Sequence, residues 1–334
     1  MYHAAIIFAG AMLASLFALG QQDEVSAKII AKVHELRQVL AGDVPQAFAS
    51  TAENCGEQLA TLGAVFERGN VYAGLQSFAG VAVPSLAISL MAAEPEATAD
   101  EDPAARIAAM KRLISSRQKS LDQMLQAPRP AAVQAIIEVL ANKARVYPDA
   151  GGAFFKVGAG SGLYYLNSGL ARIDLALFLG VLGFEQVGKR PDLPKLGIQV
   201  NRLEQEILTA YADPESAIEN HATFIQLNAG IKEMRELGER GYGLGSTLQY
   251  LALRGLMAQL SFPESHDREA LQRQTGAHKI RLGEMAEVDH SLGRLFLQQA
   301  GEALAQETPQ GDAEAARALA SLEAYWAMIE GGNR

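Results

Sequence analysis

Glu287 and His290 form the sequence Glu-x-x-His, the first candidate for chemistry in this chain. On a helix, this spacing places a carboxylate beside an imidazole. Di-iron proteins built from helix bundles use two such pairs and two further glutamates, but the sequence contains no second Glu-x-x-His. The apolar stripe of a helix predicted over 280–305 puts both residues on another, solvated face. Glu287 and His290 are therefore candidate metal ligands that lack the rest of a ligand set.

Three further side chains could line a polar pocket. Arg172 and Asp174 interrupt the apolar helix predicted over 161–184, where a charge must be paired or face water. His221 lies on the apolar stripe of a later helix, next to Glu219 in sequence. The alternatives are an ordinary ion pair or surface position for Arg172 and Asp174, and a hydrogen-bonded, half-buried side chain for His221.

Two glycine-rich turns, 158–162 and 241–246, precede predicted helices. Backbone N–H groups at the start of a helix can bind an anion. A dinucleotide site also needs a preceding strand, and a Walker loop needs Gly-Lys-Ser/Thr. The sequence indicates neither context, so the glycines are expected to serve tight turns or close packing. No cofactor is predicted.

No nucleophile motif occurs in the sequence. Glycines flank Ser161 directly, which is the wrong spacing for a nucleophile elbow. Ser265, His266 and Asp267 are consecutive, so their side chains diverge and cannot form a triad. Ser265 or Asp267 is instead expected to cap a helix. Cys55 lies on an apolar seam and is expected to be a buried structural residue. No catalytic residue is predicted, and the interpretation leans away from an enzyme.

The elements that would position these residues are predicted to be helices throughout. The chain has 334 residues, of which 49% are hydrophobic and only 7% aromatic, and alanine alone accounts for 57. Apolar residues recur at helical spacing from residue 25 onward, and no segment alternates as a strand does. We therefore predict an all-α protein of about ten helices, arranged as a multi-helix bundle or an irregular helical array.

A weak internal similarity raises the alternative of a duplicated helix pair. Residues 160–166 (GSGLYYL) resemble residues 245–251 (GSTLQYL), which follow 85 residues later. Two occurrences are few for a repeat. The other interpretation is that glycine and serine often begin helices rich in alanine and leucine.

The N-terminal residues 4–20 are uncharged and are followed at once by Gln21, Gln22, Asp23 and Glu24. Such a stretch is typical of a signal peptide or an N-terminal anchor. No Lys or Arg precedes it, which is unusual for a signal peptide. Cleavage after Gly20 would suit a signal peptidase. We expect an extracytoplasmic protein, periplasmic or secreted, with residues 4–20 as an anchor if they are not removed.

Residues 71–93 form a second uncharged stretch, long enough to cross a bilayer. Three serines, Gln76 and Pro84 make a poor lipid-facing surface, so a buried helix broken near Pro84 is favoured over membrane insertion. The acidic residues that follow, 94–103, are typical of a linker. The predicted organisation is therefore residues 1–20 as signal or anchor, 21–93 as a helical hairpin plus apolar segment, 94–103 as linker, and 104–334 as a helical domain.

The charge and the composition of the chain argue against several classes of function. A net charge of −9 argues against nucleic-acid binding, and a single cysteine excludes a disulfide framework and a cysteine-rich metal site. The favoured hypothesis is an exported, non-catalytic scaffold, adaptor or binding module with a protein partner. One alternative is a membrane-embedded or membrane-inserting protein that uses 4–20 or 71–93. Another is a helical enzyme or metal protein whose site is assembled from distant residues. A homo-oligomer is left open.

Overall fold

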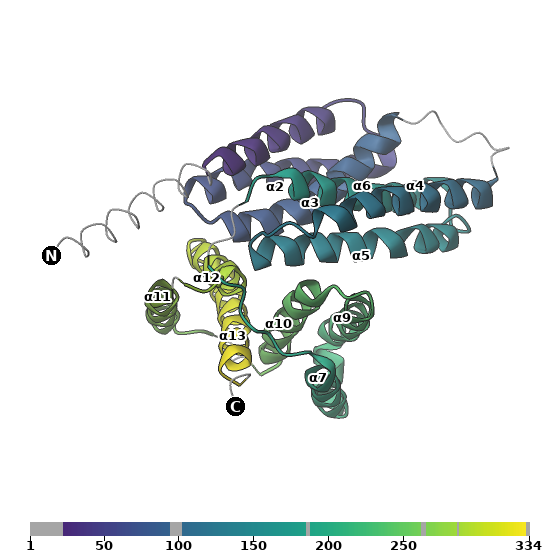
Figure 1. The fold of residues 1–334 in the computed structure, drawn as a ribbon. Coiled ribbons are helices and arrows are strands. Elements are labelled where there is room, and N and C mark those ends of the chain that lie inside the picture. The colour runs from purple at the N-terminus through teal and green to yellow at the C-terminus, as the bar shows by residue number, and fades with distance from the viewer. Residues whose placement is uncertain (1–22, 94–101, 185–187, 262–264, 286, 332–334) are drawn as a thin grey trace. The chain divides into compact units, whose positions relative to one another are not determined.

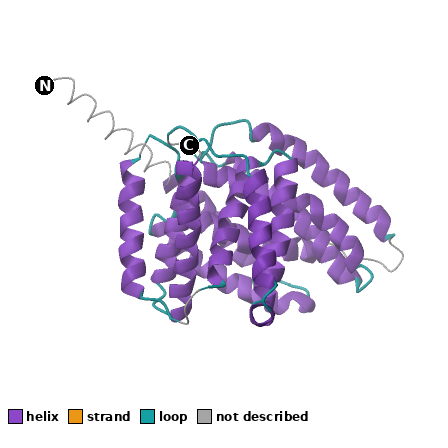
Figure 2. Ribbon diagram, turned by 90° about the horizontal axis from the view of Figure 1, so that it is seen from below, coloured by secondary structure: helices purple, strands orange, loops and turns teal. Residues whose placement is uncertain are grey.

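The computed structural model describes residues 23–93, 102–184, 188–261, 265–285 and 287–331. Within these ranges the regular elements are helices joined by loops, and none is a strand (Figure 2). The all-α prediction is confirmed. The signal or anchor at 1–20 and the acidic residues 94–101 lie outside the described residues.

The chain divides into two units. Unit 1 comprises 1–129 and 143–186, and unit 2 comprises 130–142 and 187–334. The division falls inside one helix, which contributes its first half to unit 2 and its second half to unit 1. The helices on both sides of the acidic stretch 94–103, which was the expected boundary, belong to unit 1.

Unit 1 contains a helix over 23–40, a short 3-10 helix η1, and the α-helices α2 to α4 and α6, together with the second half of α5. Their bounds are η1 Gln46–Phe48, α2 Ala49–Glu67, α3 Val71–Ala93, α4 Pro103–Met124, α5 Ala131–Phe154 and α6 Ala159–Val181 (Figure 1).

Unit 2 contains the first half of α5 and the helices α7 to α13. Their bounds are α7 Gly197–Tyr211, α8 Pro214–Glu219, α9 His221–Glu239, α10 Gly243–Gln259, α11 Arg268–Glu284, α12 Ser291–Leu304 and α13 Pro309–Gly331 (Figure 1).

Three helices begin at an aspartate that caps them. The side chains of Asp102, Asp213 and Asp267 accept hydrogen bonds from backbone N–H groups in the first turns of α4, α8 and α11. At α4 and α8 the capping residue is followed by Pro103 and Pro214, whose missing N–H costs nothing at the first helical position. Of the two residues predicted to cap the helix α11, Ser265 or Asp267, the structure shows that Asp267 caps it.

The core of unit 1 is built around α3, which packs against α2 and α6. Leu75, Phe78 and Ile88 of α3 are fully buried. Among the described residues, α3 is the one helix whose length and apolarity would suffice to cross a membrane, and a core helix passes the same test. The apolar seam predicted to contain Cys55 forms the buried face of α2, and Cys55 lies on it at 6% exposure.

Two prolines lie inside helices, and one of them, Pro84, was predicted to break its helix. α3 continues through Pro84 and α5 continues through Pro148. A proline inside a helix costs about 3 kcal/mol, which the burial of the flanking apolar residues can offset. At α5, the carbonyl of Ala144 is the one that Pro148 leaves without its helical donor. Gly169 of α6 packs close to it, since a Cβ there would lie 3.1 Å from that oxygen.

Candidate functional site

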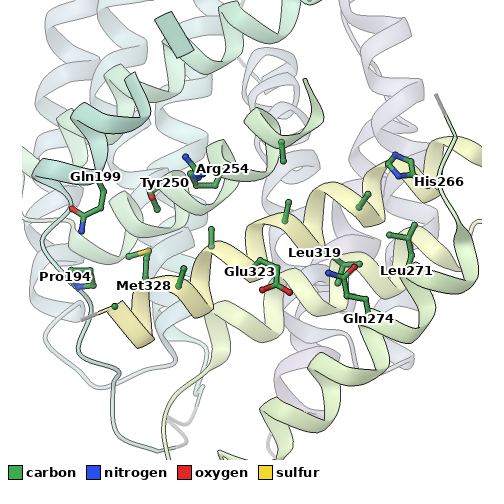
Figure 3. A pocket seen from close by; sticks show the side chains of 16 residues that line it. Pro194, Gln199, Tyr250, Arg254, His266, Leu271, Gln274, Leu319, Glu323 and Met328 are labelled. Atoms are coloured by element: carbon green, nitrogen blue, oxygen red, sulfur yellow. The ribbon is translucent and has the colours of Figure 1, made fainter. Parts of the chain in front are cut away.

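Unit 2 has an open groove of about 910 Å³ between α10, α11 and α13 (Figure 3). α13 provides the floor, which is made mostly of small side chains: Ala316, Ala320, Ala324 and Ala327. These alanines recur at a spacing of three or four residues, so they lie on one face of the helix. Small side chains along a groove allow another backbone to approach closely.

The polar groups of the groove come from several elements. Arg254 of α10 forms an ion pair with Glu206 of α7. Next to it lies Tyr250, whose hydroxyl has a pKa raised by burial. The side-chain oxygen Oε1 of Gln199 is buried and accepts no hydrogen bond from any described residue. Glu323 projects from α13 near the middle of the groove (Figure 3).

Behind Glu323 lies a buried histidine. Trp326 Nε1 donates a hydrogen bond to His278 Nδ1 over 3.1 Å. Because Nδ1 accepts this bond, the neutral ring carries its proton on Nε2. His278 Nε2 lies 2.9 Å from Glu323 Oε1, a close contact that is not aligned as a hydrogen bond. A buried pair of aromatic side chains thus stands directly behind the carboxylate of the groove.

Asp289 is a buried carboxylate that serves two helices of unit 2. Its Oδ2 accepts a hydrogen bond from Ala131 N at the start of α5 (2.7 Å), and its Oδ1 accepts one from Ser291 N at the start of α12 (3.0 Å). The positive ends of two helix dipoles therefore meet one negative charge. This arrangement gives Asp289 a structural role.

Glu138 of α5 has the same role at the start of α10. Its Oε2 accepts a hydrogen bond from Gly245 N over 2.6 Å, and its Oε1 accepts one from Gln134 Nε2 over 2.8 Å. The backbone of the turn 241–246 therefore binds a carboxyl group of the protein itself, that of Glu138. A Cβ at Gly245 would lie 2.9 Å from Glu138 Cβ, which explains the glycine. A second pocket of about 860 Å³ lies beside Glu138 and Arg190.

Burial raises the pKa of Glu138, and the hydrogen bonds from Gly245 and Gln134 oppose the shift. A carboxyl group whose pKa is raised by folding favours the folded state below its unfolded pKa, and that contribution is lost as the pH rises through its folded pKa. We therefore expect wild-type unit 2 to lose stability relative to Glu138→Gln as the pH rises from about 4 to 7.

The measurement is urea unfolding of both proteins across this pH range, followed by the fluorescence of Trp326. Burial lowers the pKa of His290, which works in the opposite direction, but this contribution is common to both proteins and cancels in their difference. A stability difference that stays constant with pH would contradict the assignment to Glu138.

Glu287 and His290 do not share a helix. The helix predicted over 280–305 is interrupted between Glu284 and Ser291, where the backbone of Lys189 bonds to that of Glu287 and Asp289. Glu287 is exposed, as predicted. His290 is buried, although the sequence predicted a solvated position for it. His290 Nδ1 is hydrogen bonded to the hydroxyl of Tyr325 (2.7 Å). Its Nε2 has no hydrogen-bond partner among the described residues.

The residues proposed for a polar pocket lie in different units. In unit 1, Asp174 forms an ion pair with Arg117, while Arg172 lies over the ring of Tyr147, 3.5 Å from its centroid. His221 lies at the start of α9 in unit 2 and is exposed, although its spacing indicated a half-buried side chain. The ion pair favoured as the ordinary interpretation of Asp174 is thus present.

No group of three or more potential metal ligands lies together in the described parts of the chain. Comparisons with protein-family models, curated proteins and solved structures found no match. The sequence did not reveal the groove of α13. The signal that could have located it is the run of alanines between 313 and 327, which on its own indicates only a helix.

Proposed function

We propose that this protein is a non-catalytic binding module that acts outside the cytoplasm, and that the groove of unit 2 receives a helical segment of a protein partner. The observation that carries the proposal is the shape of the groove. Its lining on α13 extends from Ala316 to Gly331, which spans about 22 Å at helical rise. An elongated, open groove with a floor of small residues suits a helix of about four turns better than a compact small molecule.

The charges of unit 2 support a binding role over a catalytic one. The buried carboxylates Asp289 and Glu138 are both occupied at helix starts. In the groove, Arg254 is engaged by Glu206.

Export from the cytoplasm is inferred from the uncharged residues 4–20. Export with cleavage after Gly20 predicts a mature protein that begins at Gln21. The mass of the protein recovered from the extracytoplasmic fraction tests this, and an intact Met1 on cytosolic protein would contradict it.

The binding role is tested by selecting peptides from a displayed library of random 16-residue sequences against the purified full-length chain. We expect Ala320→Arg, which fills the groove, to weaken the selected peptides at least tenfold. Ala313→Arg is the matched control, because Ala313 is also a half-buried alanine of α13 but lies outside the groove. It should change binding less than twofold. If no selected peptide distinguishes the two variants, the groove is not a binding site.

A membrane-inserting protein is the second candidate, supported by the length and apolarity of α3. Insertion would require α3 to leave its contacts with α2 and α6. Carbonate extraction of membranes that contain residues 21–334 tests it, and complete resistance to extraction would favour insertion over the binding module.

We also propose that each unit is a helix bundle and that α5–α6 and α9–α10 are a duplicated pair. α5 and α9 end at Phe154 and Glu239, which are 85 residues apart. This is the same spacing as that between the similar segments 160–166 and 245–251, which begin in the first turns of α6 and α10.

A further inference from the structure

We propose that the partner segment carries a lysine or arginine, and that Glu323 is the residue that recognises it. This inference rests on the proposed binding role of the groove. It adds the chemistry of the occupant, a short helix with one cationic side chain among small or apolar residues. The argument depends on the charges that face the groove and on the way in which Glu323 is held.

The first step is the charge balance of the groove. Glu323 lines the groove with its side chain 53% exposed, and no Lys or Arg of the described residues pairs with it. Arg254, the cation on the opposite wall, already pairs with Glu206. The groove therefore presents one carboxylate that no lysine or arginine of the described residues neutralises. A cation from outside would meet it over an apolar floor, where water screens charges less than on an open surface.

The second step is the support of Glu323 by His278 and Trp326. The N–H of Trp326 donates to His278 Nδ1 and so fixes the orientation of the imidazole ring. The other ring nitrogen, Nε2, then lies beside Glu323 Oε1. His278 therefore restricts where the carboxylate lies. We therefore treat His278 and Trp326 as positioning residues and Glu323 as the residue that contacts the partner.

The experiment uses the peptides whose binding to the full-length chain is lost in Ala320→Arg, because these occupy the groove. We expect them to be enriched in lysine or arginine at one position. For a peptide with arginine there, replacement by citrulline, which has nearly the same shape and no charge, should weaken binding to the wild type about tenfold. In the Glu323→Gln variant, the arginine peptide should bind less than about twofold more tightly than the citrulline peptide. Glu314→Gln, a neutral substitution on α13 outside the groove, should keep the tenfold difference.

The positioning role has its own readout. Trp326→Phe removes the N–H that holds His278, and we expect it to reduce the ratio of arginine to citrulline binding. A purely structural role of Trp326 would weaken both peptides equally. Groove-dependent peptides without a basic preference, or equal binding of the arginine and citrulline peptides, would overturn this inference and leave the binding module in place. If no groove-dependent peptide is found, the binding module fails, and this inference with it.

Discussion

Replacing Asp289 by alanine is expected to destabilise unit 2 by about 3 kcal/mol, since the substitution leaves two buried N–H groups without an acceptor. Ala131 N and Ser291 N both donate to this carboxylate, and Ala131 is fully buried. Water cannot replace the lost acceptor without opening the packing around the starts of α5 and α12. The charge also faces the positive ends of both helices, which adds to the loss.

Trp326 is the single tryptophan of the chain and lies buried in unit 2. Its fluorescence during urea unfolding therefore reports on this unit. Asp289→Asn keeps one acceptor oxygen and should lose roughly half as much stability. Asp267→Ala, at the exposed cap of α11 in the same unit, should cost only about 0.5 to 1 kcal/mol. Equal losses for Asp289→Ala and Asp267→Ala would show that the buried carboxylate does not hold the two helix starts.

Local sequence patterns predicted the helical class and several helix starts, because these depend on nearby residues. The period of the apolar residues identifies the buried face of α2, and Asp213-Pro214 and Asp267 mark helix starts through bonds within one turn. Prolines were less informative. Pro84 and Pro148 lie inside helices, since packing of the whole helix outweighs a local cost.

Long-range contacts explain what local patterns missed. Asp289 bonds to Ala131, 158 positions away, and Glu138 bonds to Gly245, 107 positions away. Nothing near Asp289 in the sequence indicates that it caps α5, and nothing near 241–246 indicates that Glu138 supplies the anion there. Likewise, helical spacing places the alanines of α13 on one face. Only the packing of α10, α11 and α12 decides that this face is left open as a groove.

Gly255→Ala and Gly276→Ala, two glycine substitutions inside helices of unit 2, are expected to change stability in opposite directions. A Cβ at Gly255 of α10 would lie 2.3 Å from Ser321 Oγ and 2.6 Å from the carbonyl oxygen of Arg317, both on α13. The serine side chain can rotate, but the carbonyl moves only with the helix. We expect Gly255→Ala to cost about 2 kcal/mol, since the overpacking exceeds the gain in helix propensity.

Gly276 of α11 is the matched control, because no heavy atom lies within 4 Å of a Cβ built there. Alanine at this position should stabilise unit 2 by about 0.5 to 1 kcal/mol through its higher helix propensity. Urea unfolding followed by Trp326 fluorescence measures both. If Gly255→Ala is also stabilising, α10 and α13 do not approach as closely as described. The floor of the groove, which α13 provides, would then lie farther from α10. Stability changes of opposite sign in the two variants would instead support the close contact between α10 and α13. These two helices border the groove, and the proposed recognition by Glu323 depends on their arrangement.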